Sequence, residues 1–331
     1  MTLRSPVLFS LGLLAPLFWV MAAQAQPPYD DMRALAHSRL AVQMLLNQGL
    51  SLIYGPARQA LEIQGDDNLR AFGGMSGGRQ KVANAGRTEI DGFSFLAGLG
   101  RRAAIDDSPL AAFTYGFFGE GGTGSFETSQ TFSSGNFRSE GHSRYVGGGF
   151  LVKTEFHNGS YMDVVFRVGQ ARTSLDKLYQ GGTLVDSPDL SGTYFGAAGG
   201  AGWRTPVCDQ LELDFYTRLM WSHQGTDDKH GSVEFAEINS TRFTFGTRAD
   251  FQAGEGRVVY AGAAWEYEFN GRAELNVNDP APYAELGGGS LAGEVGLKLL
   301  GEDGFSASFG VEGALGRREA LGGVLRLGYE F

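Results

Sequence analysis

The carboxyl-terminal stretch from Phe305 to Phe331 constrains the fold most, because apolar and polar residues alternate over two segments joined by a tight turn. Successive side chains of a strand point to opposite faces, so this alternation predicts two β-strands, each with one apolar face. Those faces hold Phe305, Ala307, Phe309, Val311 and Leu315 in the first segment and Leu321, Leu325, Leu327, Tyr329 and Phe331 in the second. Alternation alone is compatible with a lipid-facing wall and with a soluble sandwich, so the rest of the chain has to decide between them.

The amino terminus predicts export. Arg4 precedes an apolar run from Val7 to Ala23, and a small-residue site ends at Ala25. This order is typical of a signal peptide over residues 1–25, cleaved between Ala25 and Gln26 after delivery to the Sec translocon. A retained transmembrane helix is the weaker alternative, because no stop-transfer pattern follows the run. No other stretch approaches the roughly 20 apolar residues that such a helix needs, so a mature chain in a membrane would have to form a closed β-barrel.

Composition agrees with a barrel and argues against several other classes of protein. The chain has 51 glycines in 331 residues and 12% aromatic residues, whereas a disordered chain of this polarity would lack the aromatics. Its net charge of −10 argues against nucleic acid as a partner, because phosphate binding needs clustered Lys and Arg. Cys208 is the single cysteine, and no histidine spacing indicates a metal site. We therefore expect no cofactor and no metal.

Residues 26–65 predict a short amino-terminal helical segment. Apolar residues recur near helical spacing from Asp30 to about Ile63, with a break or kink at Gly55-Pro56. At 1.5 Å per residue, the roughly 24 residues before Gly55 would make about 36 Å of helix, comparable to the hydrocarbon thickness of a membrane. Its many polar residues forbid contact with lipid, so we expect the helix inside a barrel or outside the bilayer.

Residues 66–331 predict a barrel of twelve strands. The strands are expected near 69–79, 89–102, 109–120, 143–156, 160–173, 192–205, 210–223, 240–252, 257–270, 289–300, 305–316 and 320–331. Short connections are expected at 104–108, 157–159, 206–209, 253–256 and 301–304, and long ones at 121–142, 174–191, 224–239 and 271–288. One rim of short turns and one of long loops is typical of an up-and-down antiparallel outer-membrane barrel. With an even strand number, Cys208 would lie in a periplasmic turn.

Charged residues alternate with apolar ones in several of these strands, and we expect the charges to face the lumen. A charge at the bilayer midplane costs roughly 2–4 kcal/mol on the lipid side, which fixes the register of each strand. The main lumen-facing charges are expected to be Arg218, Arg242, Arg248, Glu266, Glu268, Glu312 and Arg326. Others are Asp163, Arg167, Glu212, Asp214, Glu294 and Lys298. We expect most of them to pair with one another and with the helix, although an unplugged lumen of mixed charge would conduct ions.

Two stretches carry a family resemblance. Ala264-Trp265-Glu266-Tyr267-Glu268-Phe269 and Gly313-Ala314-Leu315-Gly316-Arg317-Arg318 resemble signatures of the autotransporter β-domain, the twelve-stranded translocator of type V secretion. Leu325, Leu327, Tyr329 and Phe331 match the assembly signal at the carboxyl terminus of that family.

The resemblance covers about residues 66–331 and implies several expectations. It implies an outer-membrane translocator or anchor in a Gram-negative bacterium, in contact with lipid and lipopolysaccharide and acting as a monomer. Periplasmic chaperones and the barrel-assembly machinery would be its partners, and the helix would thread the pore. Members usually carry a large passenger, whereas about forty residues separate Gln26 from the first strand, so a lost passenger or a short displayed peptide is expected.

Two alternatives from other classes remain beside the translocator. One is a small outer-membrane pore; the other is a hydrolase at the rim, using His230 with Asp228 as a general base. Gly74-Met75-Ser76-Gly77-Gly78 fits G-x-S-x-G, and residues 119–124 fit G-x-G-x-x-G. Neither match has the strand-turn-helix context that gives these motifs their chemistry. We therefore expect no catalytic site and no enzyme.

Overall fold

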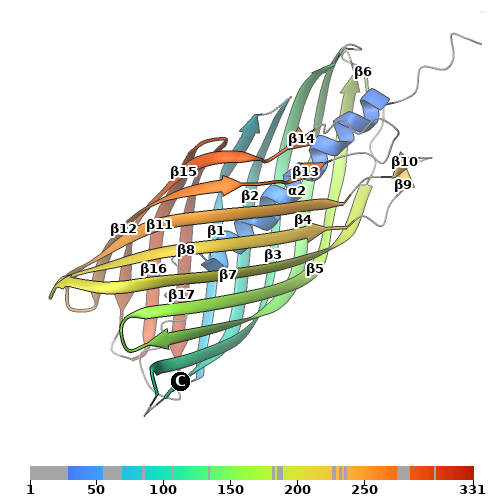
Figure 1. Cartoon of the computed structure of the whole chain (residues 1–331). Coiled ribbons are helices and arrows are strands. Elements are labelled where there is room, and N and C mark those ends of the chain that lie inside the picture. The colour runs from blue at the N-terminus through green and yellow to red at the C-terminus, as the bar shows by residue number, and fades with distance from the viewer. Residues whose placement is uncertain are drawn as a thin grey trace, which may run out of the picture.

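A computed structural model shows a closed β-barrel around one helix (Figure 1). It describes residues 29–54, 69–83, 86–105, 108–132, 135–180, 183–184, 189–225, 229–230, 233–234, 237–273, 284–301 and 303–331. The helix is α2 (Tyr29–Tyr54), and the expected segment between residues 55 and 63 lies outside the described residues. No helix in the described part of the chain is long and apolar enough to cross a membrane.

Twelve antiparallel strands form the wall, as the sequence predicts. They are β1 (Leu69–Ala83), β2 (Arg87–Ala104), β3 (Leu110–Phe132), β4 (Gly135–Phe156), β5 (Ser160–Gln180), β7 (Asp189–Cys208), β8 (Leu211–Gln224), β11 (Ile238–Gly254), β12 (Arg257–Glu268), β15 (Gly288–Leu300), β16 (Phe305–Gly316) and β17 (Arg318–Glu330). Each strand pairs with its neighbour along the chain, and β1 pairs with β17 to close the ring. Both the strand number and the up-and-down order are therefore confirmed.

The pairing of β1 with β17 places the start and end of the wall together. Arg70 lies opposite Glu330, and Val82 lies opposite Arg318. Five connections lie at this same rim, which we call the turn rim; they join β2 to β3, β4 to β5, β7 to β8, β11 to β12, and β15 to β16. The opposite rim, the loop rim, carries the short strands β6 (Thr183–Leu184), β9 (Lys229–His230), β10 (Val233–Glu234), β13 (Arg272–Ala273) and β14 (Ala284–Glu285).

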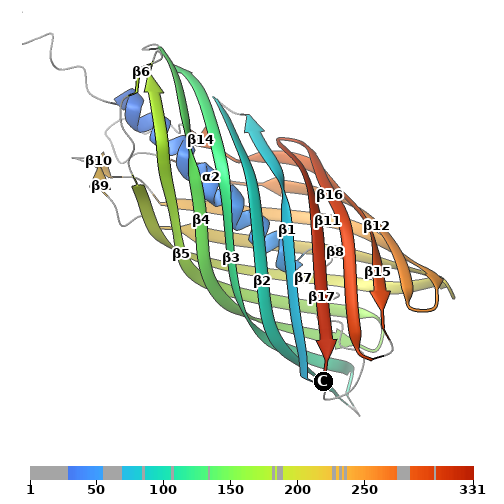
Figure 2. The ribbon, with the colours of Figure 1, turned by 180° about the vertical axis from the view of Figure 1, so that it is seen from behind.

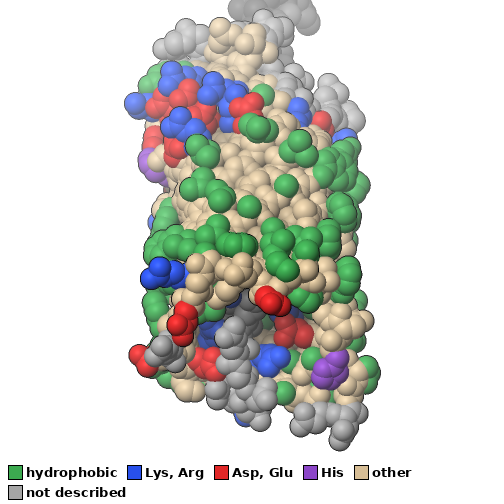
Figure 3. Space-filling model, turned by 90° about the vertical axis from the view of Figure 1, so that its left-hand side faces the viewer, with side chains coloured by type: hydrophobic (Ala, Val, Ile, Leu, Met, Phe, Trp, Pro, Cys, Tyr) green, Lys and Arg blue, Asp and Glu red, His purple; other side chains and the backbone are tan. Residues whose placement is uncertain are grey.

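The outer face carries an apolar belt. Phe117, Phe166, Phe245, Leu291, Val311 and Leu321 are among its exposed members. Figure 3 shows one side of this belt, where hydrophobic side chains gather across the middle and charged side chains gather toward both ends. Such a belt needs an apolar surrounding, because a soluble protein rarely exposes an apolar surface this continuous.

The wall is much taller on one side than on the other (Figure 2). Strand β3 has 23 residues and β4 has 22, whereas β12 and β16 have 12 each. A difference of ten residues corresponds to roughly 33 Å along a strand. The prediction of a long loop over residues 121–142 is therefore wrong, and that of a loop over 174–191 is partly wrong, because β5 runs to Gln180 and β7 begins at Asp189.

The polar outer face of the tall wall explains why the sequence pattern did not predict the extra length of its strands. Above the apolar belt, β3 presents Thr123, Ser125 and Glu127 outward, so no apolar alternation marks the strand there. Polar pairs tie neighbouring strands instead: Arg138 Nε lies 3.2 Å from Glu127 Oε1, and His142 Nδ1 lies 2.8 Å from Asp176 Oδ2. At the same height the Arg172 guanidinium donates a hydrogen bond to Asp189 and holds the pKa of that carboxyl below its usual range.

Candidate functional site: the barrel lumen

Helix α2 lies in the lumen against the tall wall, from the loop rim down to about mid-barrel (Figures 1 and 2). From Ala36 to Leu46, its apolar side chains join a cluster near the loop rim, which contains Leu40, Met44, Leu45 and inward-facing residues such as Phe126 and Leu286. Its last turns join a second cluster, in which Leu50, Leu52 and Ile53 meet Phe72, Leu96 and Phe118. Burial on the tall wall thus positions the helix.

Small residues let the helix approach the wall closely. A Cβ added at Gly49 would lie 2.0 Å from the Tyr145 hydroxyl oxygen, and one added at Gly92 would lie 2.8 Å from Leu45 Cδ1. Real Cβ atoms essentially never show such distances, so a larger residue at Gly49 would require either the buried Tyr145 side chain or the helix to shift. Glycine therefore fits the close approach of helix and wall.

Polar side chains of α2 bond to the short-strand side of the barrel. Gln43 Nε2 donates to Ser222 Oγ at 2.6 Å, and Asn47 Nδ2 donates to Ser240 Oγ at 3.2 Å. Ser240 in turn donates to Glu268 Oε1 at 2.9 Å. These contacts span the lumen from the helix to β8, β11 and β12. They fix the rotation of α2, because a turn about its axis would leave buried amides without partners.

A second set of hydrogen bonds joins α2 to β1 and β2. Gln48 Nε2 donates to Ser76 Oγ at 3.0 Å and to the Gly92 carbonyl at 3.3 Å, while Gln80 Nε2 donates to Gln48 Oε1 at 3.2 Å. Ser76 is the serine of the G-x-S-x-G match, and it lies in the middle of a strand as a partner of the helix. The G-x-G-x-x-G match lies likewise within β3. Neither stretch adopts a strand-turn-helix geometry.

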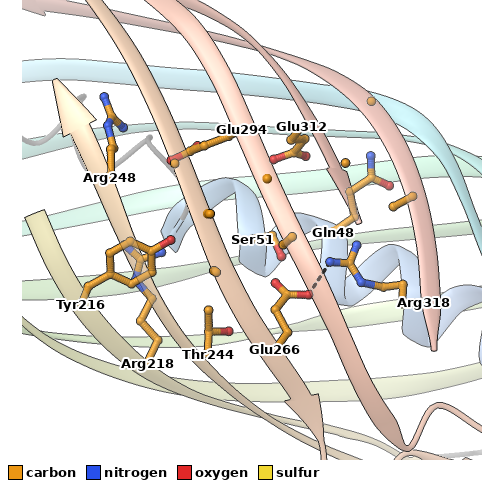
Figure 4. A pocket seen from close by; sticks show the side chains of 18 of the residues that line it. Gln48, Ser51, Tyr216, Arg218, Thr244, Arg248, Glu266, Glu294, Glu312 and Arg318 are labelled. Atoms are coloured by element: carbon orange, nitrogen blue, oxygen red, sulfur yellow. Dashed lines mark hydrogen bonds and ion pairs between the residues drawn. The ribbon is translucent and has the colours of Figure 1, made fainter. Parts of the chain in front are cut away.

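The seven main charges predicted to face the lumen lie inside the barrel on its short side, whereas Asp163 and Arg167 lie on β5 in its tall half. Arg242 Nε lies 3.4 Å from Glu268 Oε2, and Arg248 Nε lies 2.6 Å from Asp250 Oδ1. Arg218, Glu266 and Glu312 line a cavity of about 130 Å³ beside the helix, and Arg326 is 2% exposed. Figure 4 shows this cavity, with the Arg218 and Arg248 guanidiniums on one side and the Glu294 and Glu312 carboxylates across from them.

Sequence reasoning missed two ionic contacts of the lumen. Arg318 Nη2 lies 2.5 Å from Glu266 Oε2, although the sequence suggested a turn at residue 318. Deeper in the tall half, Arg167 Nη1 lies 3.2 Å from Glu120 Oε2, with both side chains almost fully buried. Tyr194 donates a hydrogen bond to Glu120 Oε1 at 2.7 Å, and the Arg167 guanidinium stacks over the Tyr194 ring. Glu120 lies at the end of the predicted strand 109–120, where alternation alone could have placed it inward.

The other predicted site residues lie at the ends of the molecule or outside its described part. Leu327, Tyr329 and Phe331 are exposed on the outer face at the turn rim, with Leu325 half-buried above them. The rings of Tyr329 and Phe331 meet edge-on at 5.0 Å. Cys208 is exposed and ends β7 at the turn rim.

The signal peptide and the rim hydrolase cannot be placed in the structure. Ala25, Gln26 and Asp228 lie outside the described residues, and of His230 only the backbone is described, in β9. Among the described residues, no group of three or more His, Cys, Asp or Glu could hold a metal ion.

Comparison with known proteins identifies related sequences and folds. The family model described as autotransporter beta-domain matches residues 68–312. The translocator domain of the autotransporter NalP from Neisseria meningitidis has a TM-score of 0.60 at 16% identity, over 86% of this chain and 95% of that chain.

Two further solved structures share the fold. The transport unit of the autotransporter AIDA-I from Escherichia coli has a TM-score of 0.57 at 16% identity, over 85% of this chain and 98% of that chain. The beta domain of the Bordetella autotransporter Brka has a TM-score of 0.56 at 18% identity, over 80% of this chain and 99% of that chain. A comparison with curated proteins finds no matching sequence.

Proposed function

The chain belongs to the autotransporter β-domain family, and we propose that it serves in the outer membrane of a Gram-negative bacterium as a translocator or anchor with a minimal passenger. In this role α2 stays in the pore through which its own amino-terminal residues have passed. The barrel acts without catalysis and without a cofactor, as a monomer in contact with lipid and lipopolysaccharide.

The fit of α2 to the lumen is the observation that carries this proposal. The helix buries apolar residues on the tall wall, while Gln43, Asn47 and Gln48 reach hydrogen-bond partners on opposite sides of the barrel. A segment in transit would not need partners matched to its side chains. The match supports a helix that comes to rest inside the barrel after transport.

The proposal of a minimal passenger is based on the small number of residues between the proposed cleavage site and the first strand of the barrel. The proposed cleavage after Ala25 leaves about forty residues before β1 begins at Leu69, and α2 takes up 26 of the residues between them. With that cleavage only residues 26–28 would precede α2, so the proposed passenger would be very short. The proposed route to the membrane uses the Sec translocon, periplasmic chaperones and the barrel-assembly machinery.

The conductance of single molecules in planar bilayers tests the plug. The mature protein should show small or absent conductance, and a variant lacking residues 26–63 should conduct far more, because the lumen beside the tall wall would fill with water. The shift of the folded band on heating in gel electrophoresis checks that both proteins form barrels. Equal, large conductance from both would mean an open pore and overturn the plug.

A further inference from the structure

Two arginines lie side by side on the outer face of the tall wall. Arg144 on β4 and Arg172 on β5 are directly opposite each other in the strand register, and both residues are exposed. Like charges at opposite positions destabilise a sheet. An anion bound between the two guanidiniums would remove their repulsion, so this part of the surface favours a negatively charged ligand.

The arginine pair lies at the upper edge of the apolar belt. On β4 the outward residues Phe150 and Val146 are exposed apolar side chains, and Arg144 is the next outward residue after Val146. On β5 the exposed Val168 lies two outward positions below Arg172. The charged headgroups of a bilayer lie directly above its hydrocarbon core. Both guanidiniums are therefore at the height where lipid phosphates lie.

One carboxylate lies beside the two arginines. Arg172 donates a hydrogen bond to Asp189, and this bond is the main reason why the pKa of that carboxyl is below its usual range. The charge of Arg144 adds a smaller effect on the same pKa. Arg144 has no hydrogen bond or ion pair with any residue that the structure describes. Two positive charges thus share one negative charge at the edge of the belt.

The other carboxylates on the outer face of β3, β4 and β5 above the belt have partners of their own. Asp176 Oδ2 lies 2.8 Å from His142 Nδ1. Higher on the wall, Glu127 Oε1 lies 3.2 Å from Arg138 Nε, and Glu140 Oε1 lies 3.0 Å from Arg138 Nη2. These pairs keep the neighbouring negative charges occupied, so they leave the positive charge at the edge of the belt in place.

Hydroxyl groups lie next to the free guanidinium. Thr123 on β3 is directly opposite Arg144, and Ser125 is opposite His142, one outward position higher. Both residues are exposed, and neither hydroxyl has a hydrogen-bond partner within the described ranges. A hydroxyl can both donate and accept a hydrogen bond, which suits the hydroxyls of a sugar.

Below the arginine pair, the wall offers a flat surface to an acyl chain. Gly148 is the first outward residue below Val146 on β4, and Gly119 lies opposite it on β3. A Cβ added at Gly119 would meet no atom closer than 4.0 Å, so the backbone there faces open space. A lipid chain can therefore lie against the backbone directly under the positive charges.

We propose that Arg144, Arg172, Thr123 and Ser125 bind the headgroup of a phosphorylated glycolipid of the outer leaflet, which in a Gram-negative bacterium is lipopolysaccharide. The two guanidiniums hold a phosphate, for which arginine offers a matching fork of donors, and the hydroxyls bind the sugar above it. This site gives the proposed contact with lipopolysaccharide a definite place on the barrel. It rests on the proposed location in the outer membrane, because that membrane supplies the lipid.

Binding of lipid A to the full mature chain in detergent, counted by native mass spectrometry, tests the site. The wild type should bind lipid A that carries its phosphates in preference to lipid A from which they have been removed. Arg144→Gln should weaken binding of the phosphorylated lipid about fivefold, the contribution of one basic residue beside an anionic membrane surface. Arg144→Lys keeps the charge and should retain most of the binding.

The matched control is Arg138→Gln, which removes an exposed arginine from the same strand, three outward positions above Arg144 and beside two carboxylates. This variant should bind lipid A as the wild type does. Equal losses in Arg138→Gln and Arg144→Gln would mean that the charge of the whole surface attracts the lipid, and would overturn the site.

Two competitors distinguish the lipopolysaccharide headgroup from other phosphates. Phosphatidylglycerol and inorganic phosphate should each displace lipid A poorly, because neither has a phosphorylated sugar to occupy both the arginines and the hydroxyls. Displacement by either one at the concentration of lipid A itself would contradict the proposal. The conductance of the variant lacking residues 26–63 does not depend on bound lipid, so a failure here leaves the proposed function standing.

Discussion

Single residues decide how tightly the tall half of the barrel is held together. Glu120 accepts hydrogen bonds from Arg167 and Tyr194 in a space that water does not reach. Arg138 and Glu127 make a pair of the same chemistry on the outer face of the same wall, but both side chains are more than half exposed. Desolvation separates the two cases, because a buried charge that loses its partner cannot turn to solvent.

Glu120→Gln should therefore lower the free energy of unfolding by about 3–5 kcal/mol, the usual effect of leaving a buried partner charge uncompensated. Glu127→Gln, the matched control, should cost about 0–1 kcal/mol, as exposed pairs do. Equilibrium unfolding of the barrel in urea and lipid vesicles, followed by tryptophan fluorescence, measures both. Equal losses would show that the Glu120 pair contributes no more than a surface pair.

At the other end of the molecule, Phe331 presents an exposed ring at the closing seam of the barrel. Phe331→Asp should slow insertion into the outer membrane, because it places a charge in the proposed assembly signal. Phe331→Tyr keeps the aromatic ring and should insert at the normal rate. Pulse-chase labelling of the heat-modifiable form follows both, and a normal level of folded barrel in the aspartate variant would count against the signal.

Among the elements, the hairpin of β3 and β4 has two functions at different heights. Its lower part carries lipid-facing residues such as Phe117 and Phe150, whereas its upper part places Phe126 and Phe137 in one buried cluster with residues of α2 from Ala36 to Leu46. The upper part is therefore a support for the helix, and we expect membrane insertion not to depend on it.

Removing residues 124–143 and closing the hairpin with Asn-Gly should leave the barrel inserted but expose Arg39, which is 2% exposed in the intact protein. Trypsin added to intact cells should then cut after Arg39 in the shortened protein only. Replacing residues 226–236 by a short turn is the control, because the strands described in that connection, β9 and β10, pair only with each other and not with the wall, and Arg39 should stay protected there. Cleavage in neither protein would mean that the lower wall alone holds the helix.

For the whole molecule, the two rims predict one orientation in the membrane. Short connections and the carboxyl terminus belong on the periplasmic side, as in other outer-membrane barrels. Cys208 is exposed at the turn rim. A membrane-impermeant maleimide should therefore leave intact cells unlabelled and label Cys208 once the outer membrane is permeabilised.

Moving the thiol to the other end checks this orientation. Ser129 is exposed on the tall wall above the apolar belt, so Ser129→Cys in a Cys208→Ser chain should react on intact cells. Labelling of Cys208 on intact cells would mean that the turn rim faces outward.

The sequence by itself determined the barrel, its strand number and, in several strands, the side that faces lipid. Within the membrane, each outward residue meets the same apolar solvent. The outward orientation of Phe243, Phe245 and Phe251 can therefore be predicted without knowing which residues lie beside them in the barrel. The lumen-facing positions of Arg242 and Arg248 followed from the same alternation. The family resemblance, confirmed over residues 68–312, rested on strands of this kind.

Only the tertiary structure decided the height of the wall, the partners in the lumen and the space beside the helix. The upper part of β3 faces water on its outer side. Polar residues such as Thr123, Ser125 and Glu127 cost nothing there, so the sequence shows no apolar alternation that would predict a strand. Gln43 and Ser222 lie 179 residues apart in the chain, and their hydrogen bond depends on where the closed ring puts both. Contact with lipid selects the residue type at each outward position independently of other positions. Contacts in the lumen instead join residues that are far apart in the sequence and meet only when the barrel closes, so local alternation does not predict them.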